Sequence, residues 1–359
     1  MARYVCSEPR ELDAPWMTAA LEGAGVALGA TVTHVDFVGL VGTGQMAQTA
    51  RFLLTWDHPD GRPSSVVGKF PSTDSTARTT GFERGSYRSE WEFYNDVVRT
   101  LRIRTPHCWV SRFRPEDQDF VLLMEDLSNC RQGDQLEGLT VDQVALAVEA
   151  AVGMHAPRFG DPTLGEFCST RARGKERAVE LAAVYGLCRE PMLARLGDGL
   201  SPDVVKFIND LVPHVERWAE GTDTPRTFVH FDYRADNFMF GVTPEAPALA
   251  VVDWQTASDA LGLIDVAYAV GGCLEPSVRA SVERDLVNDY ADRMQAQGVA
   301  LDRSTAWRDY RHSSIWGVIM SVIATVLAAE TDRGNDMLTS MAEHHGRHAI
   351  DLDALAMLR

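Results

Sequence analysis

The sequence has no paired cysteine motif and no apolar run as long as a membrane span. Its six cysteines are scattered and no C-x-x-C pair occurs, which predicts a reduced, intracellular protein without a disulfide framework. The N-terminus does not show the basic and then apolar pattern of a signal peptide. The most apolar stretch, from Ile315 to Ala329, is shorter than the ~20 residues that a membrane-spanning helix needs. We therefore expect a cytoplasmic protein with no membrane partner and a buried core helix at this stretch.

Basic residues are also in deficit. The chain has 34 Lys and Arg against 51 Asp and Glu, for a formal net charge of −17. A protein without a basic footprint cannot replace the counterions on a nucleic-acid backbone, so we expect no nucleic-acid partner. The rest of the composition, 45% hydrophobic and 24% charged over 359 residues, is ordinary for a chain that buries a core. This length suits one large two-lobed unit.

The pattern of apolar residues changes from strand-like to helical along the chain. Strands are expected at residues 32–40, 49–56, 64–70, 106–113 and 120–124, with a helix at 87–99. Thr140 and Gln143 form a capping box for a helix that ends near His155. Further single helices are expected at 307–330 and 337–357. The predicted fold class is α+β, with an N-terminal domain at 1–127 and a helical domain at 128–359.

The most informative stretch lies at residues 227–255. It contains His230, Asp232 and Asn237 in the spacing H-x-D-x-x-x-x-N, and then an apolar run that ends on Asp253. Two carboxylates and an amide beside short strands suit a metal-assisted phosphoryl transfer. One Asp accepts the proton of an attacking hydroxyl, while the Asn and the second Asp hold Mg²⁺ against nucleotide phosphates. His-x-Asp alone occurs by chance in many chains, but the full order matches the catalytic loop and metal-binding turn of kinases.

Lys69 and Glu90 are candidates for a phosphate-binding pair. Lys69 closes an otherwise apolar strand, where a charge needs a partner. Glu90 lies in the helix expected at 87–99. In kinases, a strand lysine paired with a helix glutamate aims the lysine at the α- and β-phosphates. The alternative is two unrelated surface charges, and the loop downstream favours the pair.

The turn between the first two strands contains Gly39, Gly42 and Gly44. Glycines at this place can let backbone N–H groups approach phosphates. The strict G-x-G-x-x-G spacing is absent, so a plain hairpin turn explains them equally well.

The ordered set resembles small-molecule kinases more than protein kinases. The segment VHFDYRADNFMF is similar to the aminoglycoside phosphotransferase and choline kinase-like superfamily. The segment VVDWQ, followed by Asp265-Val-Ala-Tyr, resembles the ecdysteroid-kinase-like and acyl-CoA-dehydrogenase-associated branches, as does the segment Trp307-Arg-Asp-Tyr-Arg. The resemblance covers about residues 30–330. It implies a two-lobed protein-kinase-like fold, with an N-terminal antiparallel sheet plus helix and a larger helical lobe.

The resemblance also implies roles for single residues. Asp232 would be the catalytic base, and Asn237 and Asp253 would be the Mg²⁺ ligands. Lys69, oriented by Glu90, would contact the phosphates of ATP, with Gly42 and Gly44 beside them. The hinge at 125–127, with Glu125 and Leu127, would hold the adenine edge. His230 would brace the loop rather than transfer protons, and Arg234 is a weaker candidate for contact with the γ-phosphate.

Two departures from the family pattern affect this interpretation. The family usually has Gly after the catalytic-loop His, where this chain has Phe231, and we expect this to alter local packing more than chemistry. After Asp253 the chain reads Trp254-Gln255, without the Gly of a D-F-G turn. We therefore expect no flipping activation segment and a constitutively competent enzyme.

The predicted function is transfer of the ATP γ-phosphoryl group to a hydroxyl of a small molecule, with Mg²⁺. The alternatives are a catalytically inactive nucleotide- or metabolite-binding pseudokinase and, less favoured, a kinase with a protein acceptor. Residues 160–225 and the helices after 275 are expected to line the acceptor site. The apolar helix from Trp307 to Val326 favours an uncharged or lipophilic acceptor, although it can equally be plain core. His344 and His348 lie one turn apart without a helping carboxylate, so a solvated helix end is expected there rather than a metal site.

Overall fold

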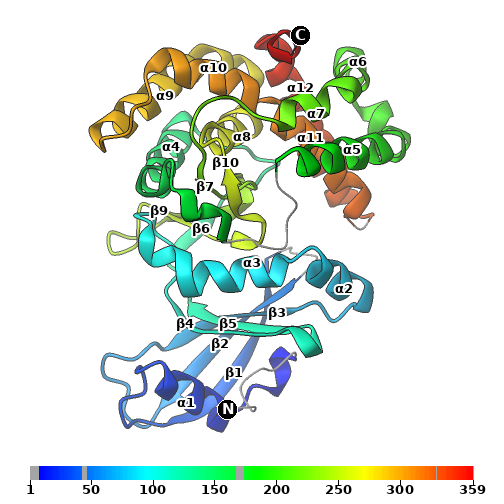
Figure 1. The fold of residues 1–359 in the computed structure, drawn as a ribbon. Coiled ribbons are helices and arrows are strands. Elements are labelled where there is room, and N and C mark those ends of the chain that lie inside the picture. Colours follow the sequence, from blue (N-terminus) through cyan, green and yellow to red (C-terminus); the bar gives the residue numbers. More distant parts are fainter. Residues whose placement is uncertain (1–7, 43–46, 167–173, 329, 359) are drawn as a thin grey trace. The chain divides into compact units, whose positions relative to one another are not determined.

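The computed structural model describes residues 8–42, 47–166, 174–328 and 330–358. The chain divides into two compact units (Figure 1). Unit 1 comprises Met1–Arg99, Thr105–Cys130 and Ala250–Thr256, and unit 2 comprises Thr100–Arg104, Arg131–Leu249 and Ala257–Arg359. Asp253 therefore belongs to the same unit as Lys69. The functional division expected at 127/128 stays a prediction.

Unit 1 is built on a five-stranded antiparallel sheet in the order β1-β2-β3-β5-β4. The strands are β1 (Val32–Val41), β2 (Ala47–Trp56), β3 (Ser65–Pro71), β4 (Cys108–Arg114) and β5 (Asp119–Glu125). The central strands carry apolar residues on both faces, as β5 shows with six of its seven positions buried. A central strand is shielded from water on both sides, which is why it tolerates a nearly continuous apolar run.

Helices cover the two faces of this sheet (Figure 1). The helices are α1 (Ala14–Gly23), α2 (Ser75–Glu83) and α3 (Ser86–Glu92), and α3 continues through one π turn at Phe93–Val97. On one face, Met17 and Leu21 of α1 pack with Phe52 and Val66. On the other, Tyr87 of α3 stacks on Phe120 with ring centroids 4.4 Å apart. Gly85, the residue before α3, has a left-handed backbone that glycine adopts without strain, and this turn sets the direction in which α3 leaves the chain.

Unit 2 is mostly helical, with a core of its own. The helices are α4 (Val141–His155), α5 (Gly174–Leu196), α6 (Pro202–Leu211), α7 (Val215–Ala219), α8 (Leu263–Cys273), α9 (Pro276–Ala296), α10 (Arg303–Ser313), α11 (Ile315–Leu327) and α12 (Asp332–Asp351). The capping box predicted at Thr140 and Gln143 is confirmed, since both reciprocal hydrogen bonds are present. Helix α8 is buried along its whole length, so it forms the centre of the unit.

Short strands frame the loops of interest. Strand β7 (Thr227–Val229) pairs antiparallel with β10 (Ser258–Ala260), with Val229 opposite Ser258. A second small sheet has the order β6-β8-β9, with β6 (Cys130–Gln132), β8 (Phe238–Gly241) and β9 (Leu249–Val251). The segment from His230 to Asn237, which holds most of the predicted catalytic-loop residues, therefore connects β7 to β8.

Two of the predicted helices have different bounds in the structure. The helix expected at 307–330 is two helices, α10 and α11, that meet at Ser314. The Ser314 hydroxyl donates to the carbonyl of Arg311 at 2.7 Å, a competing hydrogen bond of the kind that bends helices. The helix expected at 337–357 begins earlier and ends at Asp351, where Asp353 takes a left-handed backbone with φ 47°. Within the described ranges, no helix is both long and apolar enough to cross a membrane.

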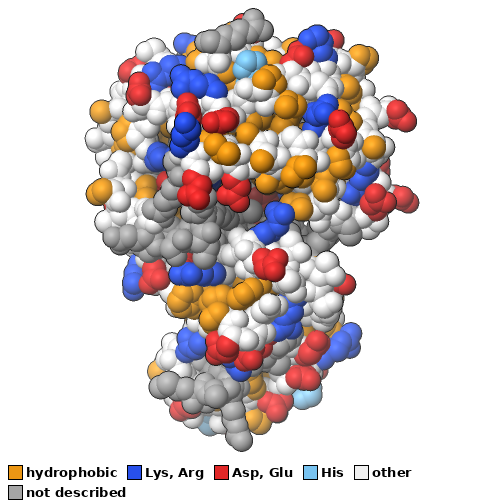
Figure 2. Space-filling model, turned by 45° about the vertical axis from the view of Figure 1, so that its right-hand side comes forward, with side chains coloured by type: hydrophobic (Ala, Val, Ile, Leu, Met, Phe, Trp, Pro, Cys, Tyr) orange, Lys and Arg blue, Asp and Glu red, His pale blue; other side chains and the backbone are white. Residues whose placement is uncertain are grey.

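The α+β organisation predicted from the sequence is confirmed. An antiparallel sheet with a helix occupies the N-terminal part, and the larger C-terminal part is helical. Charged side chains of both signs are interspersed over the face drawn in Figure 2, so the negative net charge does not gather there in one patch.

Candidate active site

In unit 1 the structure brings Lys69, Glu90 and Asp253 together. Lys69 lies on β3, paired with Thr49 and Leu122, and its side chain is 9% exposed. Its Nζ atom lies 2.6 Å from Glu90 Oε2 and 2.8 Å from Asp253 Oδ1. The two sequence-predicted charges therefore meet, and a third residue more than 180 positions away completes the group.

Burial and charge act against each other on this group. Burial alone would lower the pKa of Lys69, but the adjoining carboxylates of Asp253 and Glu90 raise it, so the lysine stays charged. Burial also raises the pKa of Glu90, and Lys69 opposes that rise. An ammonium held between two carboxylates is a fixed cation, which is the kind of group that can stabilise phosphate oxygens.

The turn that carries Asp253 is held by its neighbours. Asp253 takes a left-handed backbone with φ 65°, which costs energy in any residue with a side chain. Trp254 is fully buried and stacks on Phe93 of α3, with centroids 3.9 Å apart and planes 6° from parallel. Gln255 donates from Nε2 to Asp253 Oδ2 at 3.3 Å. The Trp-Gln pair that replaces the usual glycine turn thus fixes the carboxylate by packing.

In unit 2 the loop from His230 to Asn237 gathers polar groups on Asp232. Asn237 donates from Nδ2 to Asp232 Oδ2 at 3.0 Å and to the Asp232 carbonyl at 2.7 Å. Arg234 donates from Nε to Asp232 Oδ1 at 3.1 Å, and its Nη1 pairs with Asp236. Both oxygens of the predicted base are therefore oriented from within the loop. Since Nδ2 of Asn237 is used as a donor, Oδ1 is its atom suited to a cation.

The loop itself is anchored by Asp265, a residue that the sequence analysis did not single out for a role. Asp265 lies on α8 and is completely buried. Its Oδ2 accepts the backbone N–H of His230 at 2.7 Å, and its Oδ1 accepts that of Phe231 at 2.9 Å. His155 reaches Oδ2 through Nε2 at 3.2 Å, and its Nδ1 contacts the Tyr290 hydroxyl at 2.8 Å. A lone carboxylate inside an apolar helix is the signal that could have revealed this role, because a buried charge needs donors.

Phe231 occupies the position where the resembled family has Gly. It takes a left-handed backbone with φ 68°, which explains why glycine suits this place. Trp316 of α11 donates from Nε1 to the Phe231 carbonyl at 2.9 Å, and the two rings meet edge to face at 4.6 Å. Arg177 lies over the other ring surface at 5.5 Å. Phe231 thus ties the loop to the core of unit 2.

The remaining predicted binding residues are placed in unit 1. Gly42 follows β1 with φ 77°, a conformation that glycine adopts without strain, and Gly44 lies outside the described residues. Glu125 ends β5, where its backbone N–H donates to the His107 carbonyl at 2.8 Å. Leu127 is buried, and its carbonyl accepts the N–H of Cys130 at 2.9 Å. Their predicted contacts with phosphate and adenine stay predictions.

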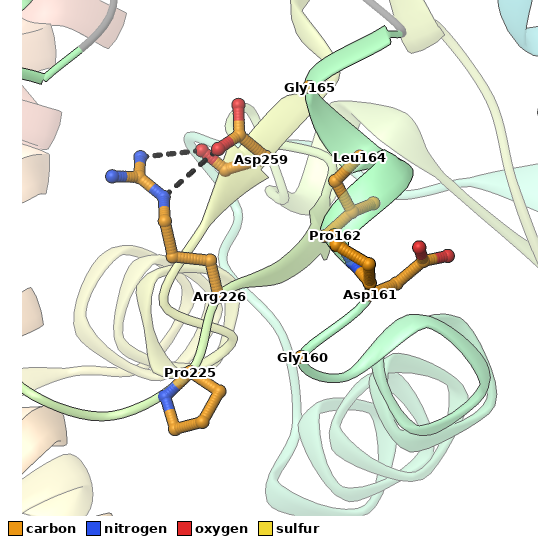
Figure 3. A pocket seen from close by; sticks show the side chains of 8 residues that line it. All are labelled: Gly160, Asp161, Pro162, Leu164, Gly165, Pro225, Arg226 and Asp259. Carbon is orange, nitrogen blue, oxygen red and sulfur yellow. Dashed lines mark hydrogen bonds and ion pairs between the residues drawn. The ribbon is translucent and has the colours of Figure 1, made fainter.

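A cavity of about 380 Å³ lies in unit 2 beside β7 and β10 (Figure 3). On one side Arg226 pairs through Nε with Asp259 Oδ2 at 3.0 Å, and across from it runs the turn from Gly160 to Gly165. These residues fall largely in the segment expected to line the acceptor site. Its use by an acceptor stays a prediction.

Two histidines of α12, His345 and His348, lie buried in unit 2. Across the part of the chain that the structure describes, no group of three or more His, Cys, Asp or Glu side chains is arranged to hold a metal. His345 and His348 are buried rather than part of a solvated helix end, so that expectation was wrong. Burial keeps the pKa of both rings below its ordinary value. The two rings can be buried because α8 and α11 present glycines to them, which leaves room for close packing.

Comparison with known proteins tests the predicted resemblance. A model of the phosphotransferase enzyme family matches residues 129–307, which include the loop and Asp253. The predicted resemblance to the aminoglycoside phosphotransferase and choline kinase-like superfamily is confirmed. No curated protein gives a significant match.

Solved structures share the fold of this chain at low identity. A provisionally assigned aminoglycoside phosphotransferase from Ralstonia eutropha JMP134 is 14% identical with a TM-score of 0.55, covering 93% of this chain and 97% of that one. Choline kinase from Cryptosporidium parvum Iowa II is 12% identical with a TM-score of 0.53, covering 90% and 91%. Wild-type aminoglycoside 2'-phosphotransferase-IIIa, solved with GDP, is 13% identical with a TM-score of 0.51, covering 91% and 98%. The predicted kinase-like fold is thus confirmed.

The anchoring role of Asp265 predicts the effect of Asp265→Asn. An amide offers one oxygen to two backbone N–H groups, so one of them loses its acceptor and faces an NH₂ group. We expect the free energy of unfolding to fall by roughly 1.5–3 kcal/mol, the value of a hydrogen bond to a charged group. Urea denaturation measures this loss, and hydrogen exchange should show faster exchange of the His230 or Phe231 amide. The exposed Asp285→Asn is the control, expected within about 0.5 kcal/mol of the parent. A loss no larger than that of the control would contradict the anchor.

The Lys69–Glu90 pair predicts a non-additive double mutant. Lys69→Met leaves Glu90 buried without its cation and should cost roughly 3–5 kcal/mol of unfolding free energy. The double variant with Glu90→Gln should lose little more than the worse single variant, because the two side chains act as one unit. The exposed pair Lys206 and Asp210 serves as the control cycle, with an expected coupling below about 1 kcal/mol. Additive losses at Lys69 and Glu90 would show that they are not coupled.

Proposed function

We propose that this chain is a kinase that transfers the γ-phosphoryl group of ATP to a hydroxyl of a small molecule with the help of Mg²⁺. The observation that carries the proposal is the catalytic loop, in which Asn237 and Arg234 orient both oxygens of Asp232 while Asp265 fixes the backbone. A carboxylate held in this way can accept the proton of an attacking hydroxyl. The phosphotransferase family match over this loop supports the same reaction class.

The proposed roles follow the chemistry of each group. Asp232 orients the acceptor hydroxyl and takes its proton. Lys69, kept charged by Asp253 and Glu90, neutralises phosphate oxygens of the nucleotide. Phosphoryl transfer needs positioning and charge stabilisation more than covalent help from the protein, so these fixed groups account for the main requirements.

The residues present fit a magnesium nucleotide. Mg²⁺ is commonly held by one or two carboxylates together with substrate phosphates, rather than by an all-protein cage. The oxygens of Asp253 and Oδ1 of Asn237 suit that arrangement, and the bound cation would offset phosphate charge. The complex of aminoglycoside 2'-phosphotransferase-IIIa with GDP supports a nucleotide cofactor. We propose ATP as the donor, and a cytoplasmic enzyme.

The acceptor is proposed only as a small molecule with a hydroxyl group. Helix α11, which had favoured a lipophilic acceptor, is largely buried in the core of unit 2, with Trp316, Ile319 and Val322 among its core residues. Its apolar character is therefore explained by packing and gives no ground for a lipophilic substrate. Choline kinase and the aminoglycoside phosphotransferases are similar structures whose names give polar acceptors, and they support a small hydroxyl compound.

The test of the function is transfer of labelled phosphate from ATP across a library of hydroxylated metabolites. Asp232→Asn keeps the size of the side chain but cannot accept a proton, so kcat should fall by roughly 10²–10⁴. Asp210→Asn, an exposed change on α6, is the matched control and should keep the parent kcat. Turnover by Asp232→Asn within a few-fold of the parent would refute this assignment. Absence of transfer to any acceptor, with nucleotide still bound, would favour a pseudokinase.

The metal assignment predicts how nucleotide stabilises the fold. At an excess of about 100 Kd, Mg·ATP should raise the free energy of unfolding by roughly 2.7 kcal/mol, and ATP with chelator should do much less. Asp253→Ala removes one proposed ligand and should abolish the Mg²⁺-dependent part, whereas the exposed Asp60→Ala should keep it. Thermal or urea unfolding at fixed nucleotide measures both. Equal stabilisation with and without Mg²⁺ would rule out the metal assignment.

A further inference from the structure

Arg51 of β2 projects from the same face of the unit 1 sheet as Lys69. Residues that pair across neighbouring strands share a face of the sheet. Lys69 pairs with Thr49 of β2, and Arg51, two positions further along β2, pairs with Val67 of β3. Side chains alternate between the two faces of a strand, so Arg51 follows Thr49 on this face at about 7 Å. The intervening Ala50 packs on the opposite face, in the cluster that includes α1.

The Arg51 side chain reaches across β3 to the segment that follows β5. Val67 pairs in turn with Met124, which lies near the end of β5. Asp126 comes two residues after Met124 and is the middle residue of the hinge at 125–127. Nη2 of Arg51 lies 2.9 Å from Oδ1 of Asp126. Since β3 lies between β2 and β5, this contact ties the hinge to a strand that is not its neighbour.

The contact depends on charge and burial. The side chain of Asp126 is 3% exposed, whereas that of Arg51 is 33% exposed. A carboxylate so far removed from water needs a compensating charge, and the guanidinium of Arg51 supplies one. The two groups form an ion pair and not an aligned hydrogen bond. Loss of the Arg51 charge would therefore favour a hinge conformation in which Asp126 reaches water.

The residues on either side of Asp126 are held by other contacts. The backbone N–H of Glu125 donates to the His107 carbonyl at 2.8 Å, and its Oε2 accepts the His107 N–H at 3.0 Å. The carbonyl of Leu127 accepts the N–H of Cys130 at 2.9 Å. These bonds connect the hinge to the start of β4 and to the turn that follows it. The ion pair adds the connection to β2, so the hinge is held from both sides of β5.

We propose that Arg51 is a positioning residue for the nucleotide, which fixes the hinge through Asp126 so that the backbone of residues 125–127 meets the nucleobase. The two cations on this face of the sheet then have separate tasks. Lys69 acts on the phosphates directly, while Arg51 acts on the base through the hinge. The inference rests on the proposed function in that it takes a nucleotide to bind at this face and at the hinge.

The experiment measures the Kd of Mg·ATP by calorimetry in variants of the pair. Arg51→Met keeps the apolar stem and removes the charge, and Asp126→Asn keeps the shape of the carboxylate. Each should raise the Kd roughly tenfold, and the double variant should be no weaker than the worse single one. Arg51→Lys keeps the charge and should stay within about threefold of the parent. Arg114→Met is the matched control, because it breaks the 2.7 Å ion pair with Asp117 in the turn after β4. It should stay within about twofold of the parent.

Two comparisons separate positioning from other effects. If Arg51 touched the nucleotide itself, Asp126→Asn would leave the affinity for ATP unchanged. Magnesium tripolyphosphate, measured by displacement of a fluorescent ATP analogue, carries the phosphates without a base. Its Kd should stay within about twofold of the parent in Arg51→Met, since Lys69 is untouched. A general loosening of unit 1 would weaken both ligands by the same factor, and urea denaturation identifies any variant that is not folded at the assay temperature.

Binding needs no acceptor, so the result does not depend on phosphoryl transfer. Weaker binding of ATP in both single variants, with tripolyphosphate unchanged, supports the inference even if no acceptor is phosphorylated. Equal losses for the two ligands, a parent-like Kd in Asp126→Asn, or an Arg51→Met that matches Arg114→Met overturns the inference and leaves the proposed function standing. A parent chain that binds no ATP overturns both.

Discussion

The buried carboxylate of Asp265 is the constraint on which the organisation of unit 2 depends. An ionised carboxylate inside an apolar helix is tolerable only if hydrogen-bond donors surround it. The donors here are two successive backbone N–H groups of the catalytic loop and the ring of His155. The Asp265 carboxylate on α8 therefore fixes the positions of His230 and Phe231, and so the position of the next residue, Asp232. The start of the loop, at His230 and Phe231, is held by its hydrogen bonds to Asp265. Further along, Asn237 and Arg234 orient the carboxylate of Asp232.

In unit 1 the buried charge is a cation, and it too is surrounded by groups that compensate it. Lys69 is a buried cation on a central strand, and two carboxylates from distant segments neutralise it. One of them, Asp253, sits in a left-handed turn that packing of Trp254 on Phe93 stabilises. An ion pair of this kind contributes little net stability against an apolar replacement, but breaking it leaves a charge stranded. The arrangement fixes geometry more than it adds stability, which is what a phosphate-binding cation requires.

The sequence predicted these features to different depths. Strands with alternating or continuous apolar residues, such as β3 and β5, were found because one face or both faces must be buried. The approach of Lys69 to Glu90 was foreseen because a charge that closes an apolar strand needs a partner. Helix α2 was missed, since its polar residues give no apolar period and only Asp74 marks its start by capping Ala77. The lone carboxylate of Asp265 in an apolar helix signals that it needs donors, but the sequence does not show that these donors are the N–H groups of His230 and Phe231, because spacing along one chain does not reveal which loop α8 packs against.

Phe231 shows how tertiary packing overrides a local preference. A left-handed backbone costs a residue with a side chain roughly 1–2 kcal/mol relative to glycine. Burying the phenyl ring against Trp316 stabilises the fold by roughly 1.5–3 kcal/mol, so the two effects nearly cancel or favour the phenylalanine. The indole N–H of Trp316 also satisfies the Phe231 carbonyl, which a left-handed residue turns away from its strand neighbours. With phenylalanine in place of glycine, the loop is held partly by the packing of Phe231 against the core of unit 2. In this chain, the geometry at Asp232 is set by the packing of α8 and α11 as much as by the loop's own residues.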